Sequence, residues 1–374
     1  MTFRGNGSLK KVPEMMEKLE IRHPMIVGME PLTGQLLKRN PVLLSSPVFS
    51  AFHPNPDLSD AETGAETFRK EGCDGLISIG GGSSIDTAKA VKALLNTSST
   101  GEAAHNRFPD RMMIPHIAIP GTAGTGSEAT QTAVVYVEGS KISLNHPGLL
   151  PEGVVLDASL LDSLPVYHKK SCALDALAQG IESYWCNSAT DDSRVHAYLA
   201  ILGVLDNLKA YLAGDSHAAE EMLDASFQSG KAIQITRTTA AHAMSYQLTK
   251  IYGLAHGHAV MVTLPVLWEM AMEHDEMKDV LADISRIMRL GNPLMVPRLL
   301  KGIMIDLDMK TPDLPDEKML DALAGSVNAE RMNNHPFPMT HEEIREAYRR
   351  AMTPMCETEK QACADIWRYY GGEA

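Results

Sequence analysis

The sequence has 374 residues, of which 44% are hydrophobic and 22% are charged, and its formal net charge is −13. This length favours two domains with a sizeable core. The negative charge argues against nucleic acid as a partner, because phosphate binding needs a basic surface, although a local basic pocket could still hold a small anionic substrate.

Cysteine content and hydropathy indicate the compartment. The chain holds an odd number of cysteines and no C-x-x-C pair: Cys73, Cys172, Cys186, Cys356 and Cys363. This suits neither a disulfide framework nor a zinc ribbon, and it indicates a reducing cytoplasm. The first twenty residues lack the apolar core of a signal peptide. No apolar run reaches the roughly 18 to 20 residues of a membrane span, so we expect a cytoplasmic protein without a membrane partner.

Short apolar strands and helical patterns alternate over the first part of the chain. The expected strands are 24–28, 47–52, 75–80, 116–120 and 133–137, and helices are expected over 57–72 and 84–95. Strands that alternate with helices predict a mainly parallel sheet covered by helices.

Helical periodicity replaces the strand signals after about residue 165. The expected helices are 171–186, 191–213, 218–233, 239–248, 256–273, 276–289, 316–328 and 341–352, with a loop over 309–317. We therefore expect an α/β domain over residues 1–163 and an all-helical domain over residues 164–374.

Two glycine-rich turns stand out in the α/β half. The segment LISIGGGSSIDTAKAVKALL, 76–95, reads as a strand, a glycine cluster and a helix whose free N–H groups suit an anion. It fits a diphosphate without being a G-x-G-x-x-G fingerprint, and a tight turn with no ligand is the alternative. The second turn, IPGTAGTGSEAT at 119–130, could wrap a phosphate or a ribose. Two such turns in one domain favour a nucleotide.

The helical half contains a group of residues that could hold a metal. Asp175 and Gln179 share one face of the helix 171–186, His242 falls on a later helix, and His256 opens the next one. Imidazole and carboxylate donors suit Fe(II) or Zn(II), which would act as a Lewis acid on a carbonyl or hydroxyl oxygen. The alternative for each histidine is a core or cap residue.

These motifs, in this order, resemble the iron-containing (group III) alcohol dehydrogenase family. The blocks that carry the resemblance span nearly the whole chain: GGGSSIDTAKA, AGTGSE, DALAQGIES, HAMSY and GLAHGHA. The resemblance implies a dinucleotide-binding α/β domain followed by an all-helical metal-binding domain. It also implies NADPH or NADH and one divalent metal ion as cofactors, and a homodimer, because family members are often dimeric.

The resemblance implies roles for individual residues as well. The positions that match cofactor-binding residues are Gly81, Gly82, Ser83, Asp86, Thr122, Thr125, Ser127 and Lys141. Asp175, His242 and His256 match three of the four metal ligands, and Gln179 stands where the common family pattern has histidine. An amide oxygen is a harder and poorer donor than imidazole, so we expect metal affinity or identity to differ.

Catalytic and cofactor-selecting residues follow from the same resemblance. Tyr246 stands where many family members carry a histidine that helps proton transfer, so it could bind substrate or only pack. His258 is an alternative proton relay. Met29 stands where an acid often selects NAD, which permits NADPH, whereas the neighbouring Glu30 favours NADH if it turns inward.

A narrower resemblance is to the branch that contains phosphonoacetaldehyde reductases, carried by FSAFHPNPDLSD, SLNHPGLLP and ESYWCNSATDDSR. It implies reduction of phosphonoacetaldehyde to 2-hydroxyethylphosphonate in phosphonate biosynthesis. The anion would need cationic partners, for which Arg237, Arg194 and His146 are candidates, although each also fits a surface, salt-bridge or turn role. The alternatives are another small aldehyde or alcohol, a sugar-phosphate cyclase of the dehydroquinate synthase type, and a non-catalytic nucleotide-binding relative.

Overall fold

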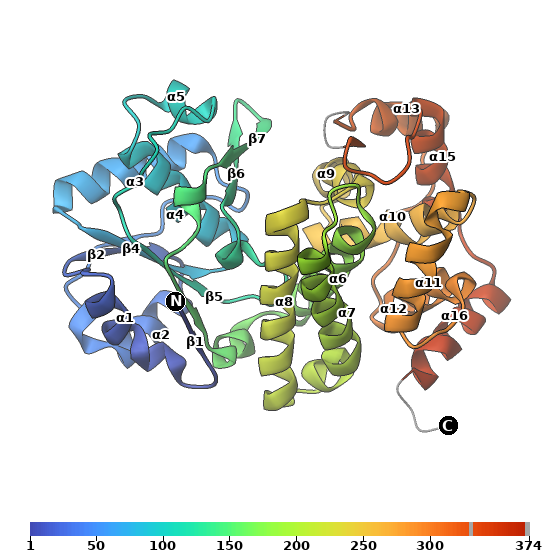
Figure 1. The fold of residues 1–374 in the computed structure, drawn as a ribbon, viewed down its shortest axis with the longest axis horizontal. Coiled ribbons are helices and arrows are strands. Elements are labelled where there is room, and N and C mark those ends of the chain that lie inside the picture. Colours follow the sequence, from blue (N-terminus) through green and yellow to red (C-terminus); the bar gives the residue numbers. More distant parts are fainter. Residues whose placement is uncertain (329–331, 371–374) are drawn as a thin grey trace. The chain divides into compact units, whose positions relative to one another are not determined.

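The computed structural model describes residues 1–328 and 332–370, which form two compact units (Figure 1). Unit 1 comprises residues 1–165 and 213–234, and unit 2 comprises residues 166–212 and 235–374. The helix α8 (Ser216–Thr236) thus lies mainly in unit 1, although it stands in the helical half of the sequence. No helix in the described ranges combines the length and the apolar character needed to cross a membrane.

Unit 1 is built on a six-stranded parallel sheet with the strand order β1-β8-β5-β4-β2-β3. In chain order the strands are β1 (Thr2–Arg4), β2 (Pro24–Gly28), β3 (Val48–Phe49), β4 (Gly75–Gly80), β5 (His116–Pro120) and β8 (Gly153–Leu156). Every residue of β2, β4, β5 and β8 is buried. A strand buried on both faces needs apolar side chains throughout, which explains the continuous apolar runs of the central strands.

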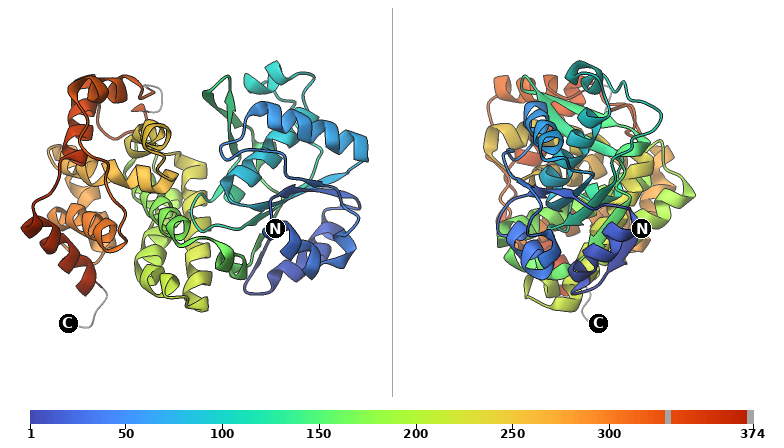
Figure 2. Two further views of the ribbon diagram at one scale, coloured as in Figure 1. Left: turned by 180° about the vertical axis from the view of Figure 1, so that it is seen from behind. Right: turned by 90° about the vertical axis from the view of Figure 1, so that its left-hand side faces the viewer.

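Helices cover both faces of this sheet. On one face lie α1 (Val12–Lys18) and α2 (Leu32–Arg39), and on the other lie α3 (Leu58–Glu71) and α4 (Gly82–Leu95) (Figure 1). Successive strand residues point to opposite faces, so Ile26 packs with the first pair of helices while Met25 and Val27 pack with the second. Figure 2 shows the same two layers from behind.

Besides most of α8, unit 1 also contains a hairpin and a short helix. The strand expected at 133–137 is β6 (Thr132–Val137), which pairs antiparallel with β7 (Ser140–Asn145) and does not join the parallel sheet. The short helix is α5 (Thr100–Ala104). The sequence patterns do not predict β1, β7 or β8, nor α1, α2 or α5. In β7 only Leu144 is buried, so that strand carries no apolar run to detect.

The described residues of unit 2 form helices and the loops between them, with no strand. Its helices are α6 (Val166–Trp185), α7 (Asp191–Leu212), α9 (Ala240–Tyr252), α10 (His256–Ala271), α11 (Lys278–Ile287), α12 (Val296–Asp306), α13 (Glu317–Gly325), α15 (His341–Met352) and α16 (Glu357–Tyr369). The sequence patterns miss α12 and α16. The first opens with Pro297, which a helix tolerates in its first turn, and the second buries only Cys363 and Trp367. An α/β half followed by a helical half is confirmed.

The helix α10 lies at the centre of unit 2, where it packs against α6, α9, α12 and α15. It crosses α6 at Gly257. A Cβ atom on Gly257 would lie 2.0 Å from the carbonyl oxygen of Ser171 and 2.6 Å from Cβ of Asp175. Only glycine fits such a crossing, which sets the distance between Asp175 and the first residue of α10, His256.

Candidate metal centre and cofactor turns

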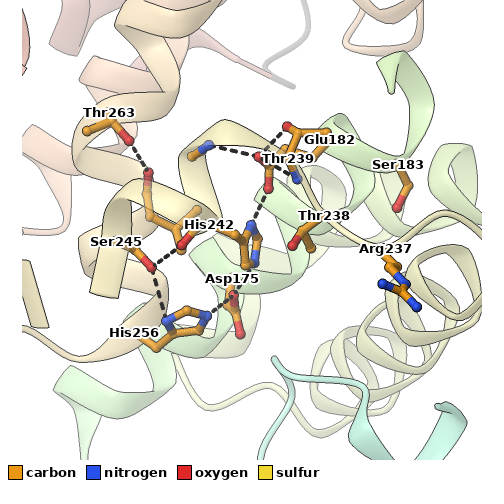
Figure 3. Close-up of polar contacts among 12 residues, drawn as sticks. Asp175, Glu182, Ser183, Arg237, Thr238, Thr239, His242, Ser245, His256 and Thr263 are labelled. Atoms are coloured by element: carbon orange, nitrogen blue, oxygen red, sulfur yellow. Dashed lines mark hydrogen bonds and ion pairs between the residues drawn. The ribbon is translucent and has the colours of Figure 1, made fainter. Parts of the chain in front are cut away.

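Three side chains from three helices of unit 2 converge on one point (Figure 3). Asp175, His242 and His256 place one carboxylate oxygen and ring nitrogens within 4.8 Å of one another. Oδ1 of Asp175 lies 3.3 Å from Nε2 of His242 and 3.9 Å from Nε2 of His256. Gln179 is buried one turn after Asp175, and its amide hydrogen-bonds the Asp175 carboxylate. The four residues proposed as metal ligands are therefore brought together.

The charges of this cluster suit a divalent ion. Burial alone would lower the pKa of His242, but Glu182 and Asp175 raise it to about 9. Burial alone would raise the pKa of Asp175, but the two histidines and the Gln179 amide hold it below its usual value. The Asp175 carboxylate thus faces a protonated His242 ring at 3.3 Å. A divalent ion could replace the proton between these two donors, and a ring nitrogen of His256 lies close to the same point, so the residues fit a metal.

Glu182 belongs to the same cluster, although the sequence motifs do not single it out. It is fully buried, one of its oxygens accepts a hydrogen bond from Nδ1 of His242, and the other accepts from the backbone N–H of Thr239 at 3.2 Å. Burial would raise the pKa of Glu182, but His242 and Thr239 lower it. A signal did exist, because Asp175, Gln179 and Glu182 follow one another at helical spacing on one face of α6.

The two catalytic candidates have different surroundings. The ring of Tyr246 stacks on His256, with centroids 6.0 Å apart and planes 4° from parallel. His258 is buried, and its Nε2 lies 3.0 Å from the carbonyl oxygen of Lys310, to which it donates. Its Nδ1 then accepts from the Tyr167 hydroxyl at 3.1 Å, and burial lowers the pKa of His258. A proton-relay role for His258 stays a prediction that requires one of these contacts to open.

The three candidates for binding an anion differ in their existing partners. Arg194 donates from Nε to the carbonyl oxygen of Tyr184 at 3.4 Å and lies over the Tyr184 ring. His146 accepts from the backbone N–H of Gly148 at 3.0 Å, as a helix-cap residue does. Arg237 is exposed between α8 and α9, and its guanidinium makes no hydrogen bond or ion pair with the described residues. Within the described chain, Arg237 is therefore the candidate with an unused cation.

The two glycine turns of unit 1 lie side by side at the carboxyl ends of β4 and β5. Gly80 pairs with Pro120 in the sheet, and the N–H of Gly121 donates to the carbonyl oxygen of Gly80 at 2.8 Å. Gly80 has φ +147°, a backbone conformation that other residues rarely adopt. The next helix, α4, begins without a side-chain cap at Gly81. Its first N–H groups can therefore receive a diphosphate, as the sequence predicts.

The predicted cofactor residues gather around these turns. A Cβ atom on Gly81 would lie 3.2 Å from the Thr122 side chain, and one on Gly82 would lie 3.1 Å from the Thr125 side chain. Ser83 lies in the first turn of α4 and accepts from a backbone N–H of the 53–57 loop. The two turns thus pack against each other, with little room for larger residues.

Asp86 and Ser127 are engaged with each other. The Ser127 hydroxyl donates to Asp86 at 2.5 Å, and the backbone N–H of Val134 donates to the other Asp86 oxygen at 3.0 Å. Burial raises the pKa of Asp86, against the opposing charges of Lys89 and Lys141. Their direct contact with a cofactor stays a prediction. Lys89, which the motifs do not single out, is fully buried beside them.

Comparison with known proteins gives the following matches. Residues 1–158 match the family model "Iron-containing alcohol dehydrogenase", and residues 170–352 match the model of the C-terminal part of the Fe-containing alcohol dehydrogenase family. A "Probable alcohol dehydrogenase EutG" of Escherichia coli is 36% identical over 219 residues, which cover 57% of this chain and 55% of that protein. A "Phosphonoacetaldehyde reductase" of Streptomyces viridochromogenes is 34% identical over 229 residues, which cover 57% of each chain.

A solved structure matches over a longer range. The sulfoacetaldehyde reductase of Bifidobacterium kashiwanohense, solved in complex with NAD+, superposes with a TM-score of 0.86 at 25% identity and covers 94% of this chain and 97% of its own. By contrast, the segments matched in the curated relatives named above span only 55% to 57% of the length of those proteins.

Proposed function

Because this chain belongs to the iron-containing alcohol dehydrogenase family, we propose that it is a metal-dependent, NAD(P)H-dependent reductase of a small anionic aldehyde. Phosphonoacetaldehyde is the first candidate, with 2-hydroxyethylphosphonate as the product. Two of the similar proteins are named for an aldehyde that carries a strongly acidic group, a phosphonate in one and a sulfonate in the other. An arginine without a partner in the described chain, close to the metal ligands in sequence, supports the same class of substrate.

The residues of the metal cluster would bind and orient the aldehyde. Asp175, His242 and His256 would hold the ion, with Gln179 beside them. When bound, such an ion polarises the carbonyl oxygen as a Lewis acid, and the nicotinamide cofactor supplies the hydride. The product alkoxide needs a proton. His258 already shares its Nε2 proton with a backbone carbonyl, which favours Tyr246 as the ionisable group that contacts the substrate.

The proposal that the substrate is anionic rests on the position of Arg237. It stands five residues before His242 with φ +62°, a left-handed conformation that costs a non-glycine residue on the order of 1 kcal/mol. Neighbours hold it there: Thr236 donates to the Arg237 carbonyl oxygen at 2.8 Å, and Asn334 donates to the Thr236 carbonyl oxygen at 2.7 Å. Figure 3 shows its guanidinium outside the hydrogen-bonded cluster. A guanidinium on a fixed backbone suits two-point recognition of a phosphonate.

The experiment for this proposal is oxidation of NADH and NADPH, followed at 340 nm, with phosphonoacetaldehyde as substrate and with acetaldehyde and lactaldehyde as neutral controls. We expect kcat/KM for the phosphonate to exceed that of the neutral aldehydes by about 100-fold, the value of one or two charge-assisted hydrogen bonds. Equal or better turnover of the neutral aldehydes would refute the anionic substrate and leave the family intact.

Arg237→Gln tests the residue that we assign to the anion. We expect a drop of about 10- to 100-fold in kcat/KM for phosphonoacetaldehyde, little change for acetaldehyde, and partial recovery in Arg237→Lys. Arg298→Gln is the matched control, because Arg298 is also an exposed arginine of unit 2 with no hydrogen bond or ion pair to the described residues. Equal losses with charged and neutral aldehydes would assign Arg237 to the fold and not to the substrate.

We further propose that NADH is preferred over NADPH. The Glu30 carboxylate stands just after β2, where it accepts from the Thr33 hydroxyl at 2.9 Å and from the backbone N–H of Gly34 at 3.3 Å. A fixed negative charge after a strand of the sheet would repel the 2′-phosphate of NADPH. Glu30→Gln should therefore raise kcat/KM for NADPH and leave that for NADH within about threefold. A wild-type preference for NADPH would contradict this assignment.

A further inference from the structure

The carboxylate of Glu182 contacts both the first residues of α9 and the ring of His242. Oε1 accepts from the Thr239 hydroxyl at 2.5 Å, from the Thr239 backbone N–H at 3.2 Å and from the Ala241 backbone N–H at 2.9 Å. Oε2 accepts from Nδ1 of His242 (Figure 3). A side chain of α6 is therefore linked by hydrogen bonds to the backbone at the start of α9 and to a proposed metal ligand on α9.

The first role of this carboxylate is to cap a helix. The N-cap residue of α9 is Thr239, and its side chain makes no capping hydrogen bond. The hydroxyl of Thr239 is instead directed to Glu182, which also accepts the N–H of Ala241 near the start of the helix. Glu182 thus supplies from α6 the acceptor that a helix N-terminus needs, and it fixes where α9 begins.

The second role concerns the protonation of His242. An ionised carboxylate can only accept hydrogen bonds, so Nδ1 of His242 must carry the hydrogen that points at Glu182. The other ring nitrogen, Nε2, is the one that faces Asp175 at 3.3 Å. A histidine whose Nδ1 holds a hydrogen offers its lone pair on Nε2, which is the atom that a metal at this point would need.

Ser245 sets the second histidine in the same way. Its hydroxyl donates to the carbonyl oxygen of His242 at 2.8 Å, which leaves its lone pairs free to accept. Nδ1 of His256 lies 3.4 Å from that hydroxyl oxygen, while Nε2 of His256 faces Asp175. Both histidines therefore present Nε2 to the same carboxylate, and in each the Nδ1 partner comes from the protein.

We propose that Glu182 is a positioning residue of the metal centre. It keeps the ring hydrogen of His242 on Nδ1, so that the lone pair of Nε2 is available to the metal, while it caps α9. Ser245 is its weaker counterpart for His256. This inference rests on the proposed metal site and assigns how the chain prepares it. Asp175 and Glu182 come from the same helix, so α6 supplies both a direct ligand and the group that orients a second ligand on α9.

Glu182→Gln separates the two roles. The substituted side chain keeps the shape of the glutamate, and its carbonyl oxygen can still accept from Thr239 and Ala241, so the cap on α9 survives. Its NH2 group then faces Nδ1 of His242 and needs a lone pair there, which moves the ring hydrogen to Nε2, where it blocks the metal. We expect the dissociation constant for Zn(II) to rise by at least about tenfold, and by up to about 100-fold, while the protein stays folded with the cap on α9 retained.

Two further variants calibrate this result. Ser245→Ala should raise the Zn(II) dissociation constant by a smaller factor, because the contact to His256 is longer. Glu269→Gln is the matched control in unit 2: its carboxylate lies 2.8 Å from both Lys301 and Arg350, away from the proposed metal ligands. It should leave Zn(II) binding within about twofold of wild type. The Co(II)-substituted proteins give a second readout, since loss of the His242 nitrogen changes the visible absorption bands.

The outcomes are distinct. A folded Glu182→Gln protein that binds Zn(II) within about threefold of wild type would overturn the inference. Absence of Zn(II), Fe(II) and Co(II) binding in the wild type would overturn the proposed function itself. If the variant does not fold, nitrogen-15 NMR of histidine-labelled wild type decides instead. With Zn(II) bound, a hydrogen on Nδ1 of His242 supports the inference, and a metal-bound Nδ1 refutes it.

Discussion

Among single residues, Gly257 sets a steric limit on the candidate metal centre. A Cβ atom there would meet the backbone oxygen of Ser171 at 2.0 Å, and backbone cannot give way as a flexible side chain can. Gly257→Ala should push α10 away from α6, separate His256 from Asp175, and cost about 1–3 kcal/mol of stability. We expect Zn(II) affinity to fall by about tenfold or more in a competition titration with a chelator. Gly325→Ala, whose Cβ would lie 3.7 Å from the nearest atom, should leave affinity unchanged.

Glu128, in the turn after β5, should make stability depend on pH. Its side chain is buried, Oε1 has no hydrogen-bond partner among the described residues, and burial raises the pKa of Glu128 to about 7. Between pH 4.5 and 7 the folded chain keeps a proton on this carboxyl that the unfolded chain releases, so stability falls as the pH rises through that window. Relative to Glu128→Gln, the wild type should lose on the order of 2–3 kcal/mol across it. Urea unfolding at several pH values measures this, and parallel curves for the two proteins would contradict it.

At the scale of elements, Lys89 ties α4 to the turn that follows β5. Its Nζ donates to the carbonyl oxygen of Ser127 at 2.6 Å, to the hydroxyl of Thr130 at 3.0 Å and to the carbonyl oxygen of Thr132 at 2.8 Å. Lys89→Met would remove these charge-assisted hydrogen bonds and loosen the turn, which we expect to raise the Kd for NADH by about five- to tenfold.

A lysine of the next turn of α4 provides the control for Lys89. Lys92 is also buried, but it pairs with Glu152 at 2.6 Å and makes no hydrogen bond to the described residues of the turn after β5. Lys92→Met should lower stability and leave NADH binding, measured by cofactor fluorescence, within about twofold of wild type. Equal weakening of NADH binding in both variants would show a general effect of destabilising α4 and not a role of Lys89 in the turn.

Elements with a strong local pattern could be predicted from the sequence, and those that depend on distant partners could not. The bounds of β4, β5 and α15 agree with the predicted ranges 75–80, 116–120 and 341–352, because continuous apolar runs and a capping box mark them. In contrast, β1 has three residues and exists because it pairs with β8, more than 140 residues away in sequence.

The same contrast holds within the candidate site. The motifs name Asp175, Gln179, His242 and His256, and the structure gathers them. Glu182 is different, because the helical spacing that puts it on one face with Asp175 and Gln179 does not say which group it contacts. Its meaning comes from the start of α9, more than 50 residues away, which no local pattern connects to it. Residues that orient the ligands are thus harder to predict than the ligands themselves, since any buried acceptor could fill that role.

For the whole molecule, the assignment of the two sites to different units has a direct consequence. The proposed metal ligands all lie in unit 2, and both glycine turns lie in unit 1. Unit 1 has two hydrophobic clusters of its own, and the helices of unit 2 pack around the buried α10, so loss of the metal should not remove the turns that receive the diphosphate. Dialysis against a chelator should therefore abolish aldehyde reduction while the Kd for NADH stays within about threefold of the untreated protein.

The metal should also stabilise unit 2 in particular. An ion present at 100 times its dissociation constant adds about 2.7 kcal/mol to the folded state to which it binds. When the metal is removed, hydrogen exchange should show faster exchange of backbone amides in α6, α9 and the start of α10, which carry the ligands. Exchange in β4, β5 and α4 should not change. Addition of Zn(II) or Fe(II) should restore both protection and turnover. Loss of NADH binding together with the metal would contradict two independent sites, since the cofactor turns contain none of the metal ligands.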